Sequence, residues 1–181
     1  MRIRINLEYI LHSWYKMDSS PRLTYEEALY RGGKIAPNVV YEITLDTTRN
    51  DLISGSARID FSLLEATESI WLDYIGEVTS LSINSKSVPI CHLMNKLYLW
   101  PLPKGSFSLY IEFSSRYSQD GTGMHYFTDP YDGLVYKYAY LCPYYANRVF
   151  PCFDQPDIKG RFSFKISAIA SNLVISNVNS R

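Results

Sequence analysis

Three histidines and three cysteines are the residues of this chain best suited to bind a metal. His12, His92 and His125 lie far apart, and none is followed four residues later by another histidine. The His-Glu-x-x-His helix of a zinc peptidase is therefore absent, and no Cys-x-x-Cys pair exists to form a zinc ribbon. An ordinary surface or hydrogen-bonded role is the preferred interpretation of each histidine. We predict no metal site on this chain, and a zinc site assembled from single distant ligands is the alternative.

A cysteine could instead act as a nucleophile activated by a histidine. Cys142 or Cys152 with His125 would supply such a pair, provided that the fold brings them together. Free cysteines are more often small buried hydrophobic residues, and Cys152 stands between Pro151 and Phe153. Packing is therefore the favoured interpretation of Cys152, and the catalytic pair is the alternative.

The segment from Tyr117 to Phe164 is dense in aromatic residues, Gly, Pro and Asp, which favours a series of turns and short strands. Its pairs Asp129-Pro130 and Asp132-Gly133 are typical of turns, and the stretch Gly121–Gly123 is better read as a turn than as a phosphate loop. We also expect Arg148 to form a buried bidentate pair with Asp154 that fixes the turn at 150–156.

Composition and charge narrow the class of protein. The chain has 181 residues, 46% of them apolar and 20% charged, which suits one soluble domain. Because 18 basic residues balance 18 acidic ones, we expect no nucleic-acid partner. The first 16 residues are interrupted by polar side chains and match neither a signal peptide nor a membrane span. The odd number of cysteines favours a reducing compartment, so a cytoplasmic location is predicted.

The elements that position these residues are predicted from periodicity. Residues 1–22 form an N-terminal extension, and a short helix follows, with Thr24 as its cap, Glu27 completing a capping box and Gly32 as its end. Apolar and polar residues then alternate in strands starting near Tyr41, Ala57, Phe107 and Phe162, and further strands are expected at Ser69–Tyr74, Thr79–Ile83, Lys96–Trp100 and Leu173–Ser176. This pattern predicts one mostly β domain over 23–181, an antiparallel β-sandwich or saddle-like sheet with one short N-terminal helix.

The run from Ala146 to Phe162 resembles ARRxFPCFDxPxxKxxF, a motif of the N-terminal domain of the aminopeptidase N family of zinc metallopeptidases. Gly123–Pro130 is similar to the GLHRFxDP stretch of that family, and Leu23–Arg31 is similar to its LTxxEAxxR helix. The residues that carry the main motif, which we interpret as structural, are Arg148, Phe150, Pro151, Cys152, Phe153, Asp154, Pro156 and Lys159.

The resemblance implies a β-saddle domain that covers the active site of a separate catalytic domain. In the family, that catalytic domain supplies the zinc helix and a Gly-x-Met-Glu-Asn segment for the substrate amine. This sequence contains neither motif. Because hydrolysis needs the metal-bound water, we predict that the chain alone is inactive and that zinc belongs only to a separate catalytic domain.

Two positions of the resemblance concern the substrate. Many family members carry Gln-x-Glu where this chain has Tyr140 and Cys142, and that pair lines the pocket for the N-terminal residue of the peptide. Replacement of the carboxylate by a thiol removes charge complementarity to an ammonium group. Family members also continue past the turn that corresponds to Ser176-Asn177, so a sheet edge is expected to be exposed here.

Two hypotheses for the function remain open. In the first, the chain shapes or caps a peptide-binding site and its partners are a catalytic aminopeptidase domain and a peptide. In the second, it is a stand-alone β-module that binds a protein or peptide and has no peptidase role. The altered Tyr140 and Cys142 favour the second hypothesis, and no membrane partner is expected in either.

Overall fold

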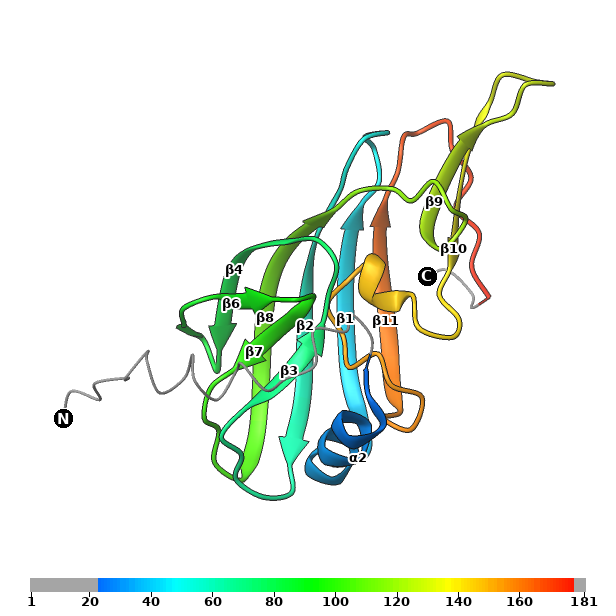
Figure 1. The fold of residues 1–181 in the computed structure, drawn as a ribbon. Helices are drawn as coiled ribbons and strands as arrows, with labels where there is room; N and C mark the ends of the chain where they lie inside the picture. The colour runs from blue at the N-terminus through cyan, green and yellow to red at the C-terminus, as the bar shows by residue number, and fades with distance from the viewer. Residues whose placement is uncertain (1–22, 178–181) are drawn as a thin grey trace.

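The computed structural model describes residues 23–177. The predicted N-terminal extension, 1–22, lies outside the described residues. The elements, in chain order, are α2 (Tyr25–Lys34), β1 (Val39–Asp46), β2 (Ile53–Leu63), β3 (Ile70–Asp73), β4 (Glu77–Ile83), β5 (Lys86–Ser87), β6 (Cys91–Leu93), β7 (Lys96–Leu99), β8 (Gly105–Ser115), β9 (Gly123–Thr128), β10 (Val135–Tyr140), the 3₁₀ helix η1 (Ala146–Arg148) and β11 (Gly160–Ser167) (Figure 1).

The capping box predicted for the helix is confirmed. The Glu27 N–H donates to Thr24 Oγ1 at 3.2 Å, and the Thr24 N–H donates to Glu27 Oε2 at 3.1 Å. The predicted end at Gly32 is wrong, because α2 continues to Lys34. A Cβ on Gly32 would lie 2.8 Å from Asp157 Oδ2, so this glycine permits close packing and does not end the helix.

A six-stranded sheet in the order β11-β1-β2-β8-β4-β5 forms the larger layer. The alternation in β1, β2 and β8 places their apolar side chains on one face, where residues such as Tyr41, Ile59 and Leu109 are buried. Every neighbouring pair is antiparallel except β1 and β11, which run parallel. Periodicity carries no information about strand direction, so the sequence did not predict the parallel pair.

A second, three-stranded sheet in the order β3-β7-β6 lies over one part of the larger sheet (Figure 1). Every residue of β3 and β7 is buried, and Ile70, Leu72 and Leu97 belong to the common core. The segment after η1 contributes Phe150 and Phe153 to the same core. The predicted fold class, mostly β with antiparallel sheets and one short helix, is confirmed.

One predicted strand is wrong. Residues 173–176 are irregular, and the side chains of Leu173 and Ile175 are 84% and 83% exposed. Within the described residues no neighbouring strand pairs with this segment, and without a partner an extended run gains no ladder hydrogen bonds.

Strands β9 and β10 form a separate two-stranded hairpin that projects from one end of the larger sheet (Figure 1). The predicted turn roles of its aspartates are confirmed, because Asp129 Oδ1 accepts from the Tyr131 N–H and Asp132 Oδ1 accepts from the Leu134 N–H, both at 2.8 Å. None of the helices in residues 23–177 is both long enough and apolar enough to cross a membrane.

Candidate functional site

The β9–β10 hairpin carries aromatic side chains on one of its two faces. Tyr136 pairs with Phe127, Tyr138 pairs with His125, and Tyr140 pairs with Gly123. The rings of Phe127 and Tyr136 are 5.5 Å apart, and those of His125 and Tyr138 are 5.1 Å apart. We call these five side chains, His125, Phe127, Tyr136, Tyr138 and Tyr140, the aromatic ladder.

The opposite face of the hairpin is attached to the body of the domain. Lys137 Nζ donates to the carbonyl oxygens of Thr47 at 2.6 Å and Arg49 at 2.9 Å, and the Tyr126 ring packs 5.6 Å from that of Tyr117. Burial lowers the pKa of the Lys137 ammonium. Because this face is anchored, the aromatic ladder is the face that meets solvent, and four of its five rings are exposed.

The two positions that resemble the family's substrate pocket lie where β10 ends. Tyr140 is the last residue of the strand, with a side chain 52% exposed and a ring 6.2 Å from that of Tyr145. Cys142 is exposed and precedes a cis peptide bond to Pro143. A phenol and a thiol therefore stand at the surface here, and the phenol is the last member of the aromatic ladder.

The predicted ion pair between Arg148 and Asp154 is wrong. Arg148 Nη1 lies 2.8 Å from Asp120 Oδ2, and its guanidinium lies over the ring of Tyr145 at 5.7 Å. Asp120 Oδ1 also accepts from the Thr122 N–H and hydroxyl, and these bonds, with Arg148, lower the pKa of Asp120 to about 2. The side chain of Arg148 points from η1 toward the hairpin. Its ion pair with Asp120 therefore connects η1 to the turn before β9.

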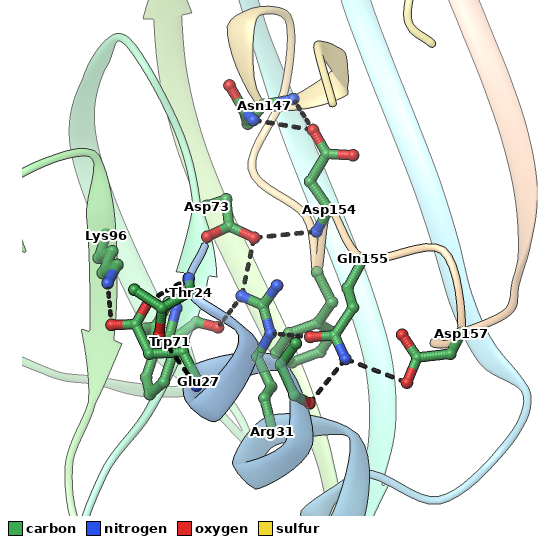
Figure 2. Close-up of polar contacts among 12 residues, drawn as sticks. Thr24, Glu27, Arg31, Trp71, Asp73, Lys96, Asn147, Asp154, Gln155 and Asp157 are labelled. Carbon is green, nitrogen blue, oxygen red and sulfur yellow. Dashed lines mark hydrogen bonds and ion pairs between the residues drawn. The ribbon is translucent and has the colours of Figure 1, made fainter. Parts of the chain in front are cut away.

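Asp154 has a different partner. Its Oδ2 accepts from the N–H of Asn147 at 3.0 Å and from the Asn147 side-chain amide at 2.8 Å (Figure 2). Its own N–H donates to Asp73 Oδ2 at 3.1 Å. Burial raises the pKa of the Asp154 carboxyl. This aspartate therefore connects η1 with the second sheet, which is a structural role.

A buried ion pair away from the hairpin joins Arg31 to Asp73. Arg31 Nη1 lies 2.7 Å from Asp73 Oδ2, and both side chains are almost completely buried. Arg31 Nε donates to Gln155 Oε1 at 2.9 Å, and Gln155 Nε2 donates to the carbonyl of Ala28 at 2.8 Å (Figure 2). One guanidinium thus links α2, β3 and the segment after η1.

Residue-by-residue reasoning missed Arg31 and Asp73. The only sequence feature that pointed to either residue was the resemblance of Leu23–Arg31 to the family's LTxxEAxxR helix, in which Arg31 occupies the arginine position. Desolvation raises the pKa of Asp73 even though Arg31 opposes that shift.

The remaining motif residues divide into buried and exposed groups. Phe150, Pro151, Cys152 and Phe153 are buried, whereas Pro156 and Lys159 are exposed. The backbone of Cys152 pairs with that of Asp73, and burial raises the pKa of its thiol well above the ordinary range. Cys152 is buried in the core, which favours the predicted packing role over that of a nucleophile.

His92 has a hydrogen-bond partner, whereas the buried Nδ1 of His125 has none among the described residues. His92 Nε2 lies 2.9 Å from the Tyr74 carbonyl oxygen, and His125 packs between the rings of Phe127 and Tyr138. His12 lies outside the described residues. Within residues 23–177, no three His, Cys, Asp or Glu side chains gather in a way that could hold a metal ion.

Comparisons with known proteins agree with the fold. The family described as the peptidase M1 N-terminal domain matches residues 37–181. Aminopeptidase N of Streptomyces lividans is 29% identical over 161 residues, which cover 86% of this chain and 19% of that protein. Probable aminopeptidase 1 of Saccharolobus solfataricus is 31% identical over 144 residues, or 78% of this chain and 18% of the relative.

Among solved structures, an M1 zinc metallopeptidase from Deinococcus radiodurans, bound to a Tyr-Ser-Ala substrate, matches with a TM-score of 0.57 and 20% identity. The match covers 81% of this chain and 37% of that chain. This chain spans less than a fifth of the length of each of the two relatives named above. Within residues 23–177, the side chains do not form a set of ligands that fits the zinc of such peptidases. The chain belongs to the family of peptidase M1 N-terminal domains.

Proposed function

We propose that this domain shapes the entrance of a peptide-binding site whose catalytic residues belong to a separate M1 catalytic domain. The observation that carries the proposal is that Tyr140, one of the two positions that resemble the family's substrate pocket, is the last member of the aromatic ladder, and that the exposed Cys142 follows it by two residues. A Tyr-rich surface has the composition of a binding interface, because aromatic rings bury a large area at a small entropic cost.

The chemistry of these positions limits what they contribute to peptide binding. Tyr140 and Cys142 can donate or accept hydrogen bonds, but their neutral forms offer no negative charge to a peptide ammonium group. The ring of Tyr140 contacts that of Tyr145, and the guanidinium of Arg148 lies over Tyr145 and is paired with Asp120. In this proposal the catalytic domain attracts the amine, whereas this domain contributes a wall of aromatic rings with hydrogen-bonding groups. The zinc of the catalytic domain would supply the activated water.

The proposal is tested by reconstitution. The chain is co-expressed with a polypeptide from the same genome that carries His-Glu-x-x-His, and turnover of aminoacyl fluorogenic substrates is measured with and without it. We expect no turnover by the chain alone, and a kcat/KM for the complex above that of the catalytic polypeptide alone. Equal kcat/KM in the presence and absence of the chain would contradict the proposal.

Variants then locate the contribution. Tyr140→Ala and Cys142→Ala are expected to change KM for substrates with large N-terminal side chains, because both alter the wall of the entrance. Tyr131→Ala is the matched control, since that ring is 97% exposed at the tip of the hairpin. An equal effect of all three variants would indicate a general loss of association and not a change in the entrance.

The second candidate is a stand-alone β-module that binds a protein or peptide without any peptidase role. The absence of a carboxylate at Cys142 favours it, because the family's charge for the substrate amine is missing there. Under this hypothesis the purified chain binds its partner with no catalytic polypeptide present, and reconstitution leaves peptidase kinetics unchanged.

A further inference from the structure

One buried side chain attaches η1 to the body of the domain. Asn147 is 2% exposed, and its N–H and its side-chain amide both donate to one oxygen, Oδ2 of Asp154, at 3.0 and 2.8 Å (Figure 2). The backbone carbonyl of Asn147 accepts from the Ile75 N–H at 2.7 Å. Among the described residues, Oδ1 of Asn147 is buried without a partner. The carboxyl of Asp154 is therefore the side chain that fixes Asn147 in this position.

A second buried carboxyl lies beside that of Asp154. Asp73 Oδ2 accepts from the Asp154 N–H at 3.1 Å and lies 2.7 Å from Arg31 Nη1. Among the described residues, Asp154 itself forms no ion pair. The other titratable groups that face it are the Tyr144 phenol and the Cys152 thiol, and because burial raises the pKa of both, they stay neutral. Two carboxyls thus share one guanidinium, and one negative charge is uncompensated when both are ionised.

This arrangement determines how protons affect the attachment of η1. Burial raises the pKa of Asp154 above its ordinary value of 3.8, and the neighbouring Asp73 adds to this rise, although the bonds from Asn147 oppose it. A carboxyl with a raised pKa binds a proton more tightly when η1 is attached than when opening exposes it to water. The proton therefore stabilises the attached state fully below 3.8, and this contribution is lost as the pH rises through the raised pKa.

The pocket positions lie on the segment that η1 ends. Cys142 comes five residues before Asn147, and Tyr145, which precedes η1, holds its ring 6.2 Å from that of Tyr140. On the other side, the ion pair of Arg148 connects η1 to the hairpin and not to the body of the domain. Release of Asn147 would therefore allow residues 141–148 to move away from the body together with the hairpin contact.

We propose that Asp154 is a proton-dependent latch, which holds residues 141–148 against the body of the domain when it is neutral and releases them more readily when it is ionised. Uptake of a proton removes the repulsion from Asp73 and the cost of burying a second anion, while one oxygen remains to accept from Asn147. Asp154 acts through Asn147, so it is a positioning residue. Its effect on a peptide entrance rests on the proposed function, whereas the latch is a property of this chain alone.

Hydrogen exchange of the full chain, with neither substrate nor catalytic polypeptide, measures the opening of the latch. NMR follows the amides of Asn147 and Ile75, which lie on the two sides of the contact, and each rate is divided by the intrinsic rate at the same pH. As the pH rises from 3.8 to the folded pKa of Asp154, their protection is expected to fall about tenfold for each pH unit and then to level off. Amides of β2 report global unfolding and should remain more protected.

Two variants separate the charge of Asp154 from its hydrogen bonds. Asp154→Asn keeps an oxygen that can accept from Asn147 but cannot ionise, so at neutral pH its Ile75 amide should be protected as strongly as that of the wild type in acid. Asp157→Asn is the matched control, because it removes an exposed carboxylate three residues further along. This control should keep the pH dependence of the wild type.

An NMR titration of the Asp154 carboxyl in the wild-type chain tests the latch without any variant, and its midpoint is expected above 3.8. A midpoint at or below 3.8, protection that grows with pH, or faster exchange in Asp154→Asn than in the wild type at neutral pH would each overturn the proposal. Equal protection at the latch and in β2 would also overturn it, since the segment would then open only with the whole domain. Failure of the reconstitution described above would contradict the proposed function and not the latch.

Discussion

Two ion pairs of similar length have opposite surroundings. Arg31 and Asp73 approach to 2.7 Å with side chains 0% and 2% exposed, whereas Arg49 and Asp51 approach to 2.6 Å with side chains 63% and 69% exposed. Removal of one buried partner leaves the other charge uncompensated, so Arg31→Met is expected to lower the free energy of unfolding by about 3–5 kcal/mol. Water already solvates the exposed pair.

Chemical denaturation followed by fluorescence measures this difference. Arg49→Met is the matched control, and its midpoint is expected to stay at that of the wild type. If Arg31→Met unfolded at the wild-type midpoint, the buried pair would not be holding α2 on the second sheet.

Asp120 gives a prediction about pH. Hydrogen bonds from Thr122 and the nearby Arg148 lower the pKa of its carboxyl from 3.8 to about 2 in the folded state. A depressed folded pKa contributes stability above the unfolded value, and this contribution is lost as the pH falls from near 3.8 to about 2. Asp120→Asn should therefore flatten the decline of the unfolding midpoint within that window. The direct check is an NMR titration, and a midpoint for Asp120 near 3.8 would contradict the assignment.

Sequence reasoning at the residue scale found the right motif and the wrong partners. Arg148 and Asp154 are close in sequence, only six positions apart, but Arg148 pairs with Asp120, 28 residues away, and Arg31 bonds Gln155 across 124 residues. Only the folded chain brings such residues together. The capping box of Thr24 and Glu27 was predictable, because both partners lie within one helical turn.

At the element scale, two glycines of the hairpin form a matched pair. Gly123 and Gly133 have positive φ angles of 67° and 70°, but a Cβ on Gly123 would lie 2.8 Å from Arg148 Cβ, whereas none of the atoms described lies within 4 Å of a Cβ on Gly133. Left-handed backbone costs a residue with a Cβ about 1–2 kcal/mol, so both alanine variants should be destabilised. Gly123→Ala should lose more, since it also displaces Arg148.

The additional destabilisation expected for Gly123→Ala can be followed through the pKa of Asp120. When Arg148 moves, its ion pair with Asp120 weakens, so the pKa of Asp120 should rise in Gly123→Ala and stay near 2 in Gly133→Ala. Equal destabilisation of the two variants together with an unchanged pKa of Asp120 would show that Arg148 does not depend on the close approach at Gly123.

Elements were predicted where a local pattern determines them. Strict alternation identified β1, β2, β8 and β11, because one face of each strand lies on the core side of the larger sheet. Alternation does not encode direction or neighbours, so the parallel pairing of β11 with β1 could not be predicted. For the same reason, the apolar run at 173–176 was wrongly predicted as a strand: its pattern does not show whether a neighbouring strand exists, and none pairs with it among the described residues.

At the scale of the whole molecule, the two sheets share one core and the hairpin stands apart from it. Ile59 of β2, Leu109 of β8 and Leu97 of β7 are fully buried together, whereas Tyr131 at the hairpin tip is 97% exposed. The sequence predicted a single mostly β domain because its strands and turns repeat throughout. It could not predict that one face of the hairpin would be anchored by Lys137 and the other left open, since that depends on the carbonyls of a distant turn.

This division predicts two levels of hydrogen exchange. Amides of β2, which lies between β1 and β8, should exchange only through global unfolding, whereas amides of residues 128–135 should exchange through local opening. Arg31→Met lowers global stability by about 3–5 kcal/mol, so it should accelerate exchange in β2 by about 100-fold or more. The hairpin tip should exchange at its wild-type rate in the same variant, because its opening does not involve α2.

Exchange followed by mass spectrometry on peptides covering 53–63 and 128–135 measures both rates in one experiment. If the two segments accelerated by the same factor, the hairpin would unfold with the core, and the aromatic ladder would be a rigid part of the domain and not a locally opening one.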